Sequence, residues 1–391
     1  MNFDVIIVGG GPVGLSLAAA LKPSGLGLAL VESQSLTKPD NTVTGKDDWD
    51  SRIYAISPGS RSFIQQCGAW TLLNTARIQP VEEMRVFGDT GAELEFSAYQ
   101  MGVPELACIL ENRALHQALD RVVQQQDNLT VFQPAHCVAL DVAKETASLT
   151  LDDGRRLEAK LIVGADGRDS WIRNQAGLGA TPVDYRQSGV VANFSVEQAH
   201  RGIAYQWFQP DGILALLPLP GKRVSMVWSV SPERSSELLS CTHDRLCDEV
   251  AVAAGNVLGD MQVITPPAAF PLRLLVLPRI VSSRVALIGD AAHNMHPLAG
   301  QGVNTGFRDA QQLAQLLLQR GQQTDSGDAY LLRSYERKRK EDIYTMQATT
   351  YGLKHLFNND LAMLRFMRNL GLDATNRMDP LKKMLMQHAL N

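Results

Sequence analysis

The sequence has few cysteines and no excess of basic residues, and both shortages exclude classes of protein. The net charge is -4, which gives no reason to expect nucleic-acid binding. The cysteines are odd in number and include no C-x-x-C pair, so reduced thiols in a cytoplasmic protein are expected instead of a disulfide framework or a zinc site. They are Cys67, Cys108, Cys137, Cys241 and Cys247.

Long hydrophobic runs are also lacking. No stretch approaches the roughly 20 apolar residues that span a bilayer. The apolar run at 5–8 is short, has no basic leader and continues into glycines, so no signal peptide is predicted. Any membrane contact is therefore expected to be peripheral. The 391 residues, 45% hydrophobic and 20% charged, are typical of a globular protein with two intertwined domains.

The chain opens with an apolar run at 3–8, a glycine-rich turn and a helical pattern at 15–21. In this context the first glycine makes the turn, the second admits a pyrophosphate, and the third lets helix and strand pack closely. The residues expected along the pyrophosphate are Gly9, Gly11, Pro12, Val13 and Gly14.

A second strand is predicted at 28–31 and ends on Glu32. This is close to the expected spacing for the acid that holds a ribose 2′-OH. Strand, turn, helix and terminal acid in register predict a dinucleotide site. The alternative interpretation is a tight strand-to-helix turn without a ligand.

The stretch 287–306 repeats the pattern near the other end of the chain. A buried strand is predicted at 285–288, followed by about a dozen residues without regular structure and then a helix whose apolar face begins at Phe307. Bare N–H groups at a helix N-terminus bind anions, and Asp290 is placed to accept a ribose or ribityl hydroxyl. Regular structure is expected to be interrupted at Gly289, Pro297, Gly300, Gly302 and Gly306.

A third loop follows a predicted strand that ends near Gly164. It contains Asp166, and Ser170 is expected to cap a short helix. Asp166 is interpreted as a cofactor residue, with a turn aspartate as the alternative. Between 183 and 271 the texture changes to short alternating apolar segments with Pro/Gly turns, which indicate an antiparallel sheet with a helical patch at 237–254.

This change of sequence pattern predicts a discontinuous nucleotide-binding domain with an insertion. The first domain would comprise 1–80, 100–182 and 272–345, and the β-rich substrate domain 81–99 and 183–271, including a hairpin at 84–96. Residues 346–391 would form a helical C-terminal region. It either packs on the core or presents a basic amphipathic surface to a membrane or a partner.

Several charged or polar residues have two open interpretations. Arg52 and Arg113 lie either at the surface or near a cofactor and its phosphates, and Glu111 is expected to cap a helix at 109–123. The charge run 335–342 is expected to be a solvated helix face. Two histidines three residues apart with no third ligand nearby make a metal site improbable, so His293 and His296 are expected to line the site or to form hydrogen bonds.

Three loops in this order resemble those of class A flavin-dependent aromatic hydroxylases: Gly9–Gly14, Gly164-Ala-Asp-Gly167 and Gly289-Asp-Ala-Ala-His293. The likeness covers nearly the whole chain. Other stretches are similar to the ubiquinone-biosynthesis hydroxylase branch of this class, namely 289–306, 110–112, 212–218 and 364–372. One departure from the family is Arg168-Asp169, where a small and a polar residue are usual.

The resemblance implies an α/β class A flavin monooxygenase fold, with a Rossmann-like FAD-binding domain, an inserted antiparallel β-rich substrate domain and a helical C-terminus. It implies that FAD is reduced by a transiently visiting NAD(P)H and reacts with O2 to a C4a-hydroperoxide. This species would hydroxylate an electron-rich ring, here a polyprenyl-phenol or benzoquinol intermediate in ubiquinone biosynthesis. Such a reaction needs no side-chain nucleophile, and no general base is assigned.

The resemblance also implies roles for individual residues. Glu32 would hold the adenosine ribose, Arg52 and Arg113 would lie along the FAD, and Asp166 and Gly289 would belong to its loops. Asp290 would contact the ribityl or pyrophosphate region. The flavin ring would be bordered by Pro297, Gly300, Gln301, Gly302, Val303 and Asn304.

Three alternatives remain open from the sequence: hydroxylation of a small soluble aromatic acid, a flavin-dependent polyprenyl reductase, and a non-catalytic flavin-bound scaffold subunit. The expected location is cytoplasmic, peripheral on the inner face of the membrane. The C-terminal region is then expected to meet the membrane surface or other ubiquinone-biosynthesis proteins, and a homo-oligomer is compatible with the sequence.

Overall fold

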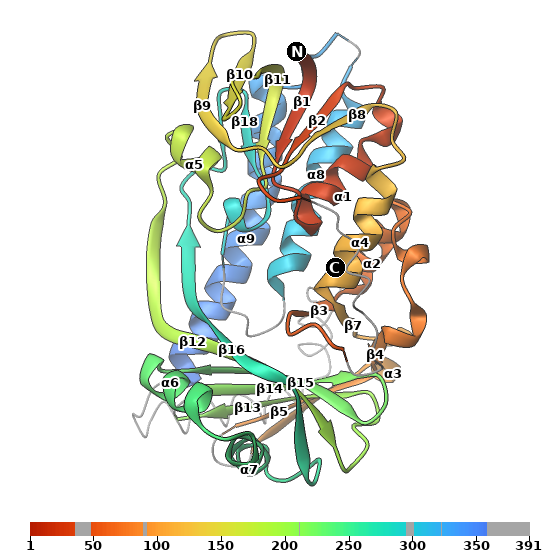
Figure 1. Ribbon diagram of the computed structural model, residues 1–391, viewed down its shortest axis with the longest axis vertical. Helices are drawn as coiled ribbons and strands as arrows, with labels where there is room; N and C mark the ends of the chain where they lie inside the picture. Colours follow the sequence, from red (N-terminus) through yellow and green to blue (C-terminus); the bar gives the residue numbers. More distant parts are fainter. Residues whose placement is uncertain (36–47, 89–91, 211, 295–300, 322, 358–391) are drawn as a thin grey trace.

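A computed structural model of the protein describes residues 1–35, 48–88, 92–210, 212–294, 301–321 and 323–357. This part of the chain forms a mostly parallel sheet, a large antiparallel sheet and a small sheet, joined and covered by helices (Figure 1). The parallel sheet lies at the top of the view and the large sheet at the bottom, with the long helix α9 running between them.

The upper sheet has the order β17-β18-β11-β1-β2-β8, and β10 and β9 extend it beside β11. The pairs from β8 to β18 are parallel. Its central strands are runs of Val, Ile and Leu that are buried, as parallel strands covered on both faces require. The bounds are β1 Asn2–Val8, β2 Leu28–Val31, β8 Leu129–Phe132, β9 Cys137–Val142, β10 Ala147–Leu151, β11 Arg156–Gly164, β17 Val281–Ser282 and β18 Val285–Leu287.

Helix α1 (Pro12–Ala20) connects β1 to β2 and packs against both α4 (Asn112–Val123) and α8 (Gln301–Gln319). Helix α9 (Ala329–Phe357) packs against α8 and β17. The apolar faces of these helices and the parallel strands share one hydrophobic core. This core positions the glycine-rich turns that follow β1 and β18.

The lower sheet has the order β16-β12-β15-β14-β13-β5-β6, antiparallel except for the β13–β5 pair. Helices α6 (Pro232–Ser240) and α7 (His243–Ala253) cover one face over a second hydrophobic core that includes Phe194 and Trp228. The bounds are β5 Glu83–Phe87, β6 Glu93–Ser97, β12 Thr181–Val196, β13 Ile203–Gln209, β14 Gly212–Leu219, β15 Arg223–Val230 and β16 Met261–Val276.

A three-stranded sheet, β3-β7-β4, joins the two larger sheets. Trp49, Ile109 and Leu219 are buried together where this small sheet packs on the large one. The remaining elements are short: β3 Ile53–Ile56, β4 Gln79–Val81, β7 Ala107–Glu111, α2 Pro58–Gln66, α3 Ala98–Met101, α5 Trp171–Gln175, and the 3-10 helices η1 Lys22–Ser24, η2 Trp70–Leu72, η3 Thr75–Arg77 and η4 Gly289–Ala291.

Two predictions of local structure are wrong. The helix predicted at 109–123 begins at Asn112, because residues 109–111 belong to β7 and pair with β3. Regular structure was also not expected at Gly302 and Gly306, yet both lie inside α8. A Cβ at Gly306 would lie 2.7 Å from Val13 Cγ2, so this glycine serves helix packing and not a loop.

The charge run 335–342 is not a solvated face throughout. Tyr335 and Arg339 are buried and face α8 and β18, while Arg337 and Glu341 on the same helix are exposed. The predicted domain boundaries at 183 and 271 fall inside β12 and β16. The division into domains at these residues stays a prediction, as does the helical region beyond 357, which lies outside the described residues.

Candidate active site

The turn between β1 and α1 contains two glycines whose positions are set by packing and one that faces open space. Gly9 has φ +110°, and a Cβ there would lie 2.3 Å from the carbonyl oxygen of Ala165. A Cβ at Gly14 would lie 2.0 Å from the Gly9 oxygen, whereas a Cβ at Gly11 would meet no atom within 4 Å. Gly11 is also the N-cap of α1 and provides no side-chain cap, so the first N–H groups of the helix suit an anion.

Glu32, at the end of β2, lies beside this turn. Its Oε2 accepts a hydrogen bond from the Gly10 N–H at 2.6 Å, and its Oε1 accepts from the Gln34 N–H at 2.9 Å. A carboxylate is therefore held next to the glycine turn, at the end of the second strand, where the dinucleotide-binding pattern has its acid.

The loop after β11 borders the same turn, because Ala165 contacts Gly9. Asp166 does not point its carboxylate to open space. Its Oδ1 accepts from Ser170 Oγ at 2.5 Å and its Oδ2 from the Ile172 N–H at 3.0 Å, so it supports the cap of α5. Ser170 caps that helix, as predicted, by accepting from the Arg173 N–H at 2.9 Å. These hydrogen bonds hold the loop of Asp166 beside the turn at Gly9, and a contact between Asp166 and the cofactor stays a prediction.

The turn after β18 lies directly against the first turn. Gly289 has φ +60°, and Val13 on α1 lies between Gly289 and Gly306, at 3.4 and 2.7 Å from the Cβ positions of these glycines. Asp290 follows in η4 with an exposed side chain. Two glycine turns that are nearly 280 residues apart in sequence therefore meet at one edge of the parallel sheet.

Strand β3 brings Tyr54 to this edge, and Arg52 immediately precedes the strand. The Arg52 guanidinium lies 5.4 Å from the centroid of the Tyr54 ring. Burial raises the pKa of Tyr54 to about 12; the Arg52 charge opposes the shift, and the Asp290 and Asp50 carboxylates add to it. Arg52 and Asp290 are thus neighbours of one phenol. Tyr54 is a functional candidate that no sequence pattern indicated, although it lies only two residues after Arg52.

Arg113 is held by the segment that precedes β3. Its guanidinium donates to the Asp48 carbonyl at 3.2 Å and lies 3.5 Å from the Asp48 carboxylate. Its backbone N–H donates to Asp50 Oδ2 at 2.9 Å. Glu111 occupies the N-cap position of α4, but its side chain forms no capping hydrogen bond. Its carboxylate instead accepts two hydrogen bonds from Arg77, at 2.6 and 3.0 Å, and one from the Asp50 N–H.

Asp50 is a functional candidate that the sequence analysis missed. Besides the contacts with Arg113 and Glu111, its carbonyl accepts from Asn193 Nδ2 at 2.9 Å, which connects the arginine-bearing segment to β12 of the large sheet. Its position inside a polar loop gave no signal of this role.

The start of α8 supplies the residues expected near the flavin ring. Asn304 accepts from the Ser57 N–H at 3.0 Å and donates to the Ala55 carbonyl at 2.8 Å, so its amide holds α8 against β3. Val303 packs partly into the core, and Gln301 is buried. A Cβ at Gly302 would meet no atom within 4 Å among the described residues outside its own helix turn. Pro297, Gly300 and His296 lie outside the described residues.

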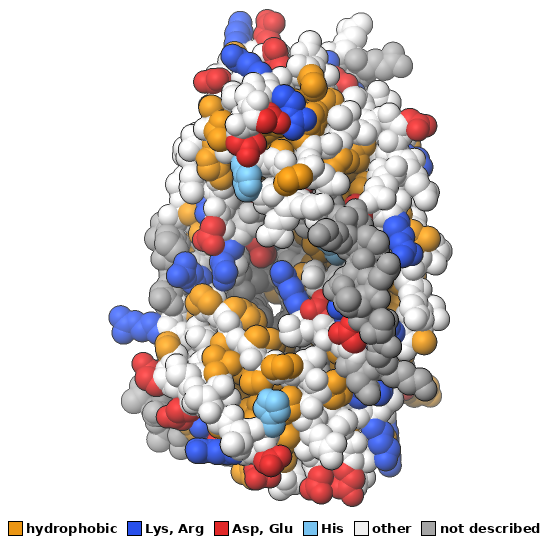
Figure 2. Space-filling model, viewed as in Figure 1, with side chains coloured by type: hydrophobic (Ala, Val, Ile, Leu, Met, Phe, Trp, Pro, Cys, Tyr) orange, Lys and Arg blue, Asp and Glu red, His pale blue; other side chains and the backbone are white. Residues whose placement is uncertain are grey.

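The surface is hollowed at mid-height, between the parallel sheet and the large sheet, with basic and hydrophobic side chains at its border (Figure 2). A glycine turn with an open side at Gly11, a second glycine turn that carries the exposed Asp290, a carboxylate beside the first turn, and arginines just before β3 and on α4 suit a flavin dinucleotide. The fold and this arrangement define a flavoprotein of the class A monooxygenase type.

The chain belongs to the FAD binding domain family, whose model matches residues 2–350. Among solved structures, p-nitrophenol 4-monooxygenase PnpA from Pseudomonas putida DLL-E4 has the same fold, with a TM-score of 0.79 at 16% identity over 100% of this chain and 99% of that one. The predicted fold and FAD as cofactor are therefore confirmed, and the protein is an FAD-dependent aromatic-ring monooxygenase.

Relatives match the chain over nearly its whole length. It is 36% identical to ubiquinone hydroxylase UbiL of Rhodospirillum rubrum, over 99% of this chain and 89% of that protein. It is 35% identical to the 3-demethoxyubiquinol 3-hydroxylase of Escherichia coli, over 99% and 98%. It is 32% identical to the mitochondrial ubiquinone biosynthesis monooxygenase COQ6 of Xenopus tropicalis, over 99% and 93%.

Proposed function

We propose that the protein hydroxylates the aromatic ring of a polyprenyl-phenol or benzoquinol intermediate in ubiquinone biosynthesis, with O2 and NAD(P)H as co-substrates. The observation that carries this proposal is the 35–36% identity, over 99% of the chain, to two bacterial proteins named for the hydroxylation of ubiquinone or its precursor. Identity over both the nucleotide-binding turns and the large sheet supports a shared substrate class as well as a shared cofactor.

Bound FAD supplies the activation of O2 and the transfer of one oxygen atom to the ring. The chain's own residues bind it and orient it. The first N–H groups of α1 would face the pyrophosphate, Glu32 the adenosine ribose and Asp290 the ribityl chain. Arg52 and Arg113 would lie along the cofactor. The residues proposed to form these contacts are Gly9, Gly11, Pro12, Val13, Gly14, Glu32, Arg52, Arg113, Gly289 and Asp290.

The N-terminus of α8 would border the flavin ring. Because no described residue outside its own helix turn has an atom within 4 Å of a Cβ built at Gly302, the described part of the chain leaves room for a flat ring to approach the backbone there. The partial positive charge at a helix N-terminus would stabilise a reduced, negatively charged ring. Gln301, Gly302, Val303 and Asn304 are proposed for this border, with Pro297 and Gly300 just before them. Asp166 would act indirectly, by holding its loop against Gly9.

The large sheet favours a neutral substrate over a small aromatic acid. Among the described residues of β12–β15, no Arg, Lys, Asp or Glu side chain is buried; the buried polar side chains are those of Gln187, Asn193, Gln206, Ser225 and Ser229. A buried carboxylate substrate needs a charged partner to offset the loss of its hydration. A polyprenylated phenol or quinol needs only hydroxyl or amide partners and apolar contacts.

The proposal is tested by the quinone-intermediate profile of cells that lack the protein. We expect one under-hydroxylated polyprenyl precursor to accumulate and ubiquinone to recover with the wild type. Asp290→Ala at equal abundance should not restore it, whereas Asp141→Ala, at an exposed carboxylate on β9, should. Normal ubiquinone without precursor, in cells that also lack other hydroxylases of this family, would contradict the proposal.

We also propose that the C-terminal region meets a membrane surface, where a polyprenylated substrate resides. Along the outward side of α9, Tyr330 and Tyr344 are 80% and 41% exposed, and Arg333 and Arg337 are exposed between them. Exposed aromatic and basic side chains on one helix suit the interface of an anionic bilayer. None of the helices within the described ranges is long and apolar enough to cross a membrane.

A further inference from the structure

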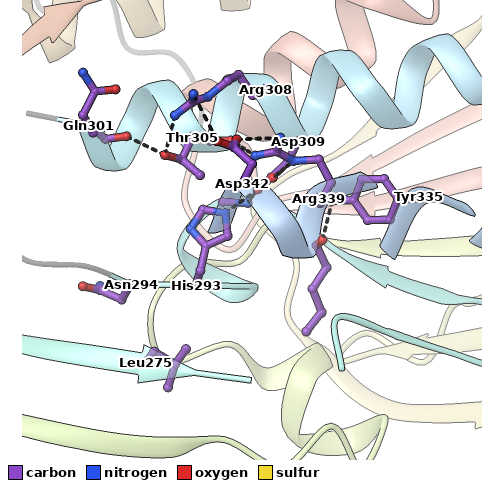
Figure 3. Close-up of polar contacts among 12 residues, drawn as sticks. Leu275, His293, Asn294, Gln301, Thr305, Arg308, Asp309, Tyr335, Arg339 and Asp342 are labelled. Carbon is purple, nitrogen blue, oxygen red and sulfur yellow. Dashed lines mark hydrogen bonds and ion pairs between the residues drawn. The ribbon is translucent and has the colours of Figure 1, made fainter. Parts of the chain in front are cut away.

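Asp309 on α8 is a fully buried carboxylate that ties three elements together (Figure 3). Its Oδ2 accepts hydrogen bonds from the Gly289 N–H at 2.9 Å and from His293 Nε2 at 2.6 Å. Its Oδ1 accepts from Arg339 Nε, on α9, at 2.6 Å. One carboxylate therefore holds a turn on one side and a distant helix on the other.

The turn that Asp309 holds is the one that presents Asp290. The Ala292 and His293 N–H groups donate to the Gly289 carbonyl at 2.8 and 3.0 Å and close the turn. The Asp309 carboxylate binds the backbone N–H of Gly289, the first residue of this turn, and the side chain of His293, the last residue. Because both ends are fixed by the same carboxylate, the direction in which Asp290 points depends on where Asp309 lies.

Helix α9 sets the position of Asp309 from the other side. Arg339 also donates to Asp342 Oδ2 at 2.8 Å and to the Thr305 carbonyl at 3.4 Å. One turn earlier along α9, Tyr335 donates to the carbonyl of Leu287, two residues before the turn. A lysine could not form the bridge that Arg339 makes, because an ammonium group lacks the planar, forked donors of a guanidinium.

Two carboxylates and two guanidinium groups meet in this cluster. Asp309 and Asp342 face Arg339 and Arg308, whose Nη1 lies 3.5 Å from Asp342 Oδ1. Burial opposes ionisation of Asp309, but the His293 and Arg339 charges and hydrogen bonds outweigh it and keep the pKa of this carboxyl below its ordinary value. A buried ionic network is seldom more stabilising than apolar packing of the same volume, but it does fix geometry.

We propose that His293, Asp309 and Arg339 are positioning residues that fix the Gly289–Asp290 turn for FAD and couple that turn to α9. The inference rests on the proposed place of Asp290 at the cofactor. It is independent of which ring the enzyme hydroxylates, because it concerns the binding of FAD and not the substrate. It also gives a structural role to the charge run 335–342, which the sequence pattern predicts to be a solvated helix face.

The first test is Arg339→Lys, with Arg337→Lys on the exposed side of the same helix as the control. We expect the FAD dissociation constant of Arg339→Lys, measured by fluorescence titration of the apoprotein, to rise at least tenfold, and that of the control to stay within twofold. The urea concentration at which half of the apoprotein is unfolded shows whether the substitution acts on the stability of the fold instead of on the position of the turn. A lowered midpoint with unchanged FAD affinity would overturn the proposal.

A second pair of variants at His293 gives an answer even where Arg339→Lys fails to fold. His293→Gln keeps a neutral N–H donor toward Asp309, whereas His293→Leu has similar volume and no donor. FAD affinity should fall in the leucine variant and recover in the glutamine variant. Equal affinities in both would contradict a role for the hydrogen bond.

The route through Asp290 is tested by a double-mutant cycle. If Arg339 acts by placing Asp290, the loss of affinity caused by Arg339→Lys should shrink below threefold in an Asp290→Ala background. An undiminished tenfold loss in that background would rule out this route. Because every readout is FAD binding, these results stand apart from the identity of the aromatic substrate.

Discussion

Two glycines in the first turns of α8 should respond in opposite ways to the same substitution. A Cβ at Gly306 would lie 2.7 Å from Val13 Cγ2, whereas one at Gly302 would meet no atom of the described residues outside its own helix turn within 4 Å. In an unobstructed helix alanine is favoured over glycine by about 1 kcal/mol. A β-branched valine cannot rotate away easily, and forcing a methyl group into such a contact costs about 1–3 kcal/mol.

We therefore expect Gly306→Ala to lower the free energy of unfolding of the apoprotein by up to about 2 kcal/mol, since the packing cost exceeds the gain in helix propensity. Gly302→Ala should leave that free energy unchanged or raise it by up to about 1 kcal/mol. It should nevertheless weaken FAD binding, because the new methyl group occupies the open side of the turn. Urea unfolding measures the first effect and fluorescence titration with FAD the second.

A suppressor checks the physical cause. Val13→Ala removes the atom that the new methyl group would meet, so Gly306→Ala should be less destabilising in a Val13→Ala background than in the wild type. The reasoning is refuted by a Gly306→Ala protein at least as stable as the wild type, or by a Gly302→Ala protein that binds FAD normally.

Three further predictions concern acid stability, thiol reactivity and membrane binding. The pKa of the Asp309 carboxyl lies below its ordinary value of 3.8, so its ionised form stabilises the fold above about pH 4, and this stabilisation is lost as the pH falls further. The free energy of unfolding of Asp309→Asn should therefore depend less on pH in that range, and the same pH dependence as in the wild type would contradict this role of Asp309. Burial raises the pKa of Cys67 to about 12, so near pH 8 it should react with iodoacetamide far more slowly than in the unfolded chain, and equal rates would disprove this. The double variant Tyr330→Ser, Arg333→Glu, which alters the exposed side of α9, should reduce co-sedimentation with anionic liposomes, and unchanged binding by the folded variant would count against a membrane-facing α9.

Local patterns predicted the elements that carry the cofactor. The strand before Gly9, the acid at Glu32 and the strand that ends at Gly164 each depend on residues adjacent in sequence, and the structure has them at the expected places. The hairpin at 84–96 is also confirmed, because β5 and β6 pair with each other as antiparallel strands.

Features that depend on distant partners were missed. Ile109 and Leu110 continue the apolar pattern of the following helix, but pairing with β3 and β4 makes them a strand. In the sequence, Asp309 and Arg339 have the pattern of ordinary helix-surface charges. Packing of α8 on α9 brings Asp309 Oδ1 to 2.6 Å from Arg339 Nε and buries both side chains. From the sequence alone, Gly306 indicates a loop. In the structure it lies in α8 and allows α1 to pack closely against that helix.

The most direct test of the proposed reaction uses the purified protein with FAD, NAD(P)H, a polyprenylated phenol or quinol precursor and isotope-labelled O2. We predict that one labelled oxygen atom enters the ring of the precursor, and that Asp290→Ala at equal protein concentration gives no labelled product. Oxidation of NAD(P)H that yields only hydrogen peroxide with every such precursor, or label that enters a small aromatic acid instead, would contradict the assignment.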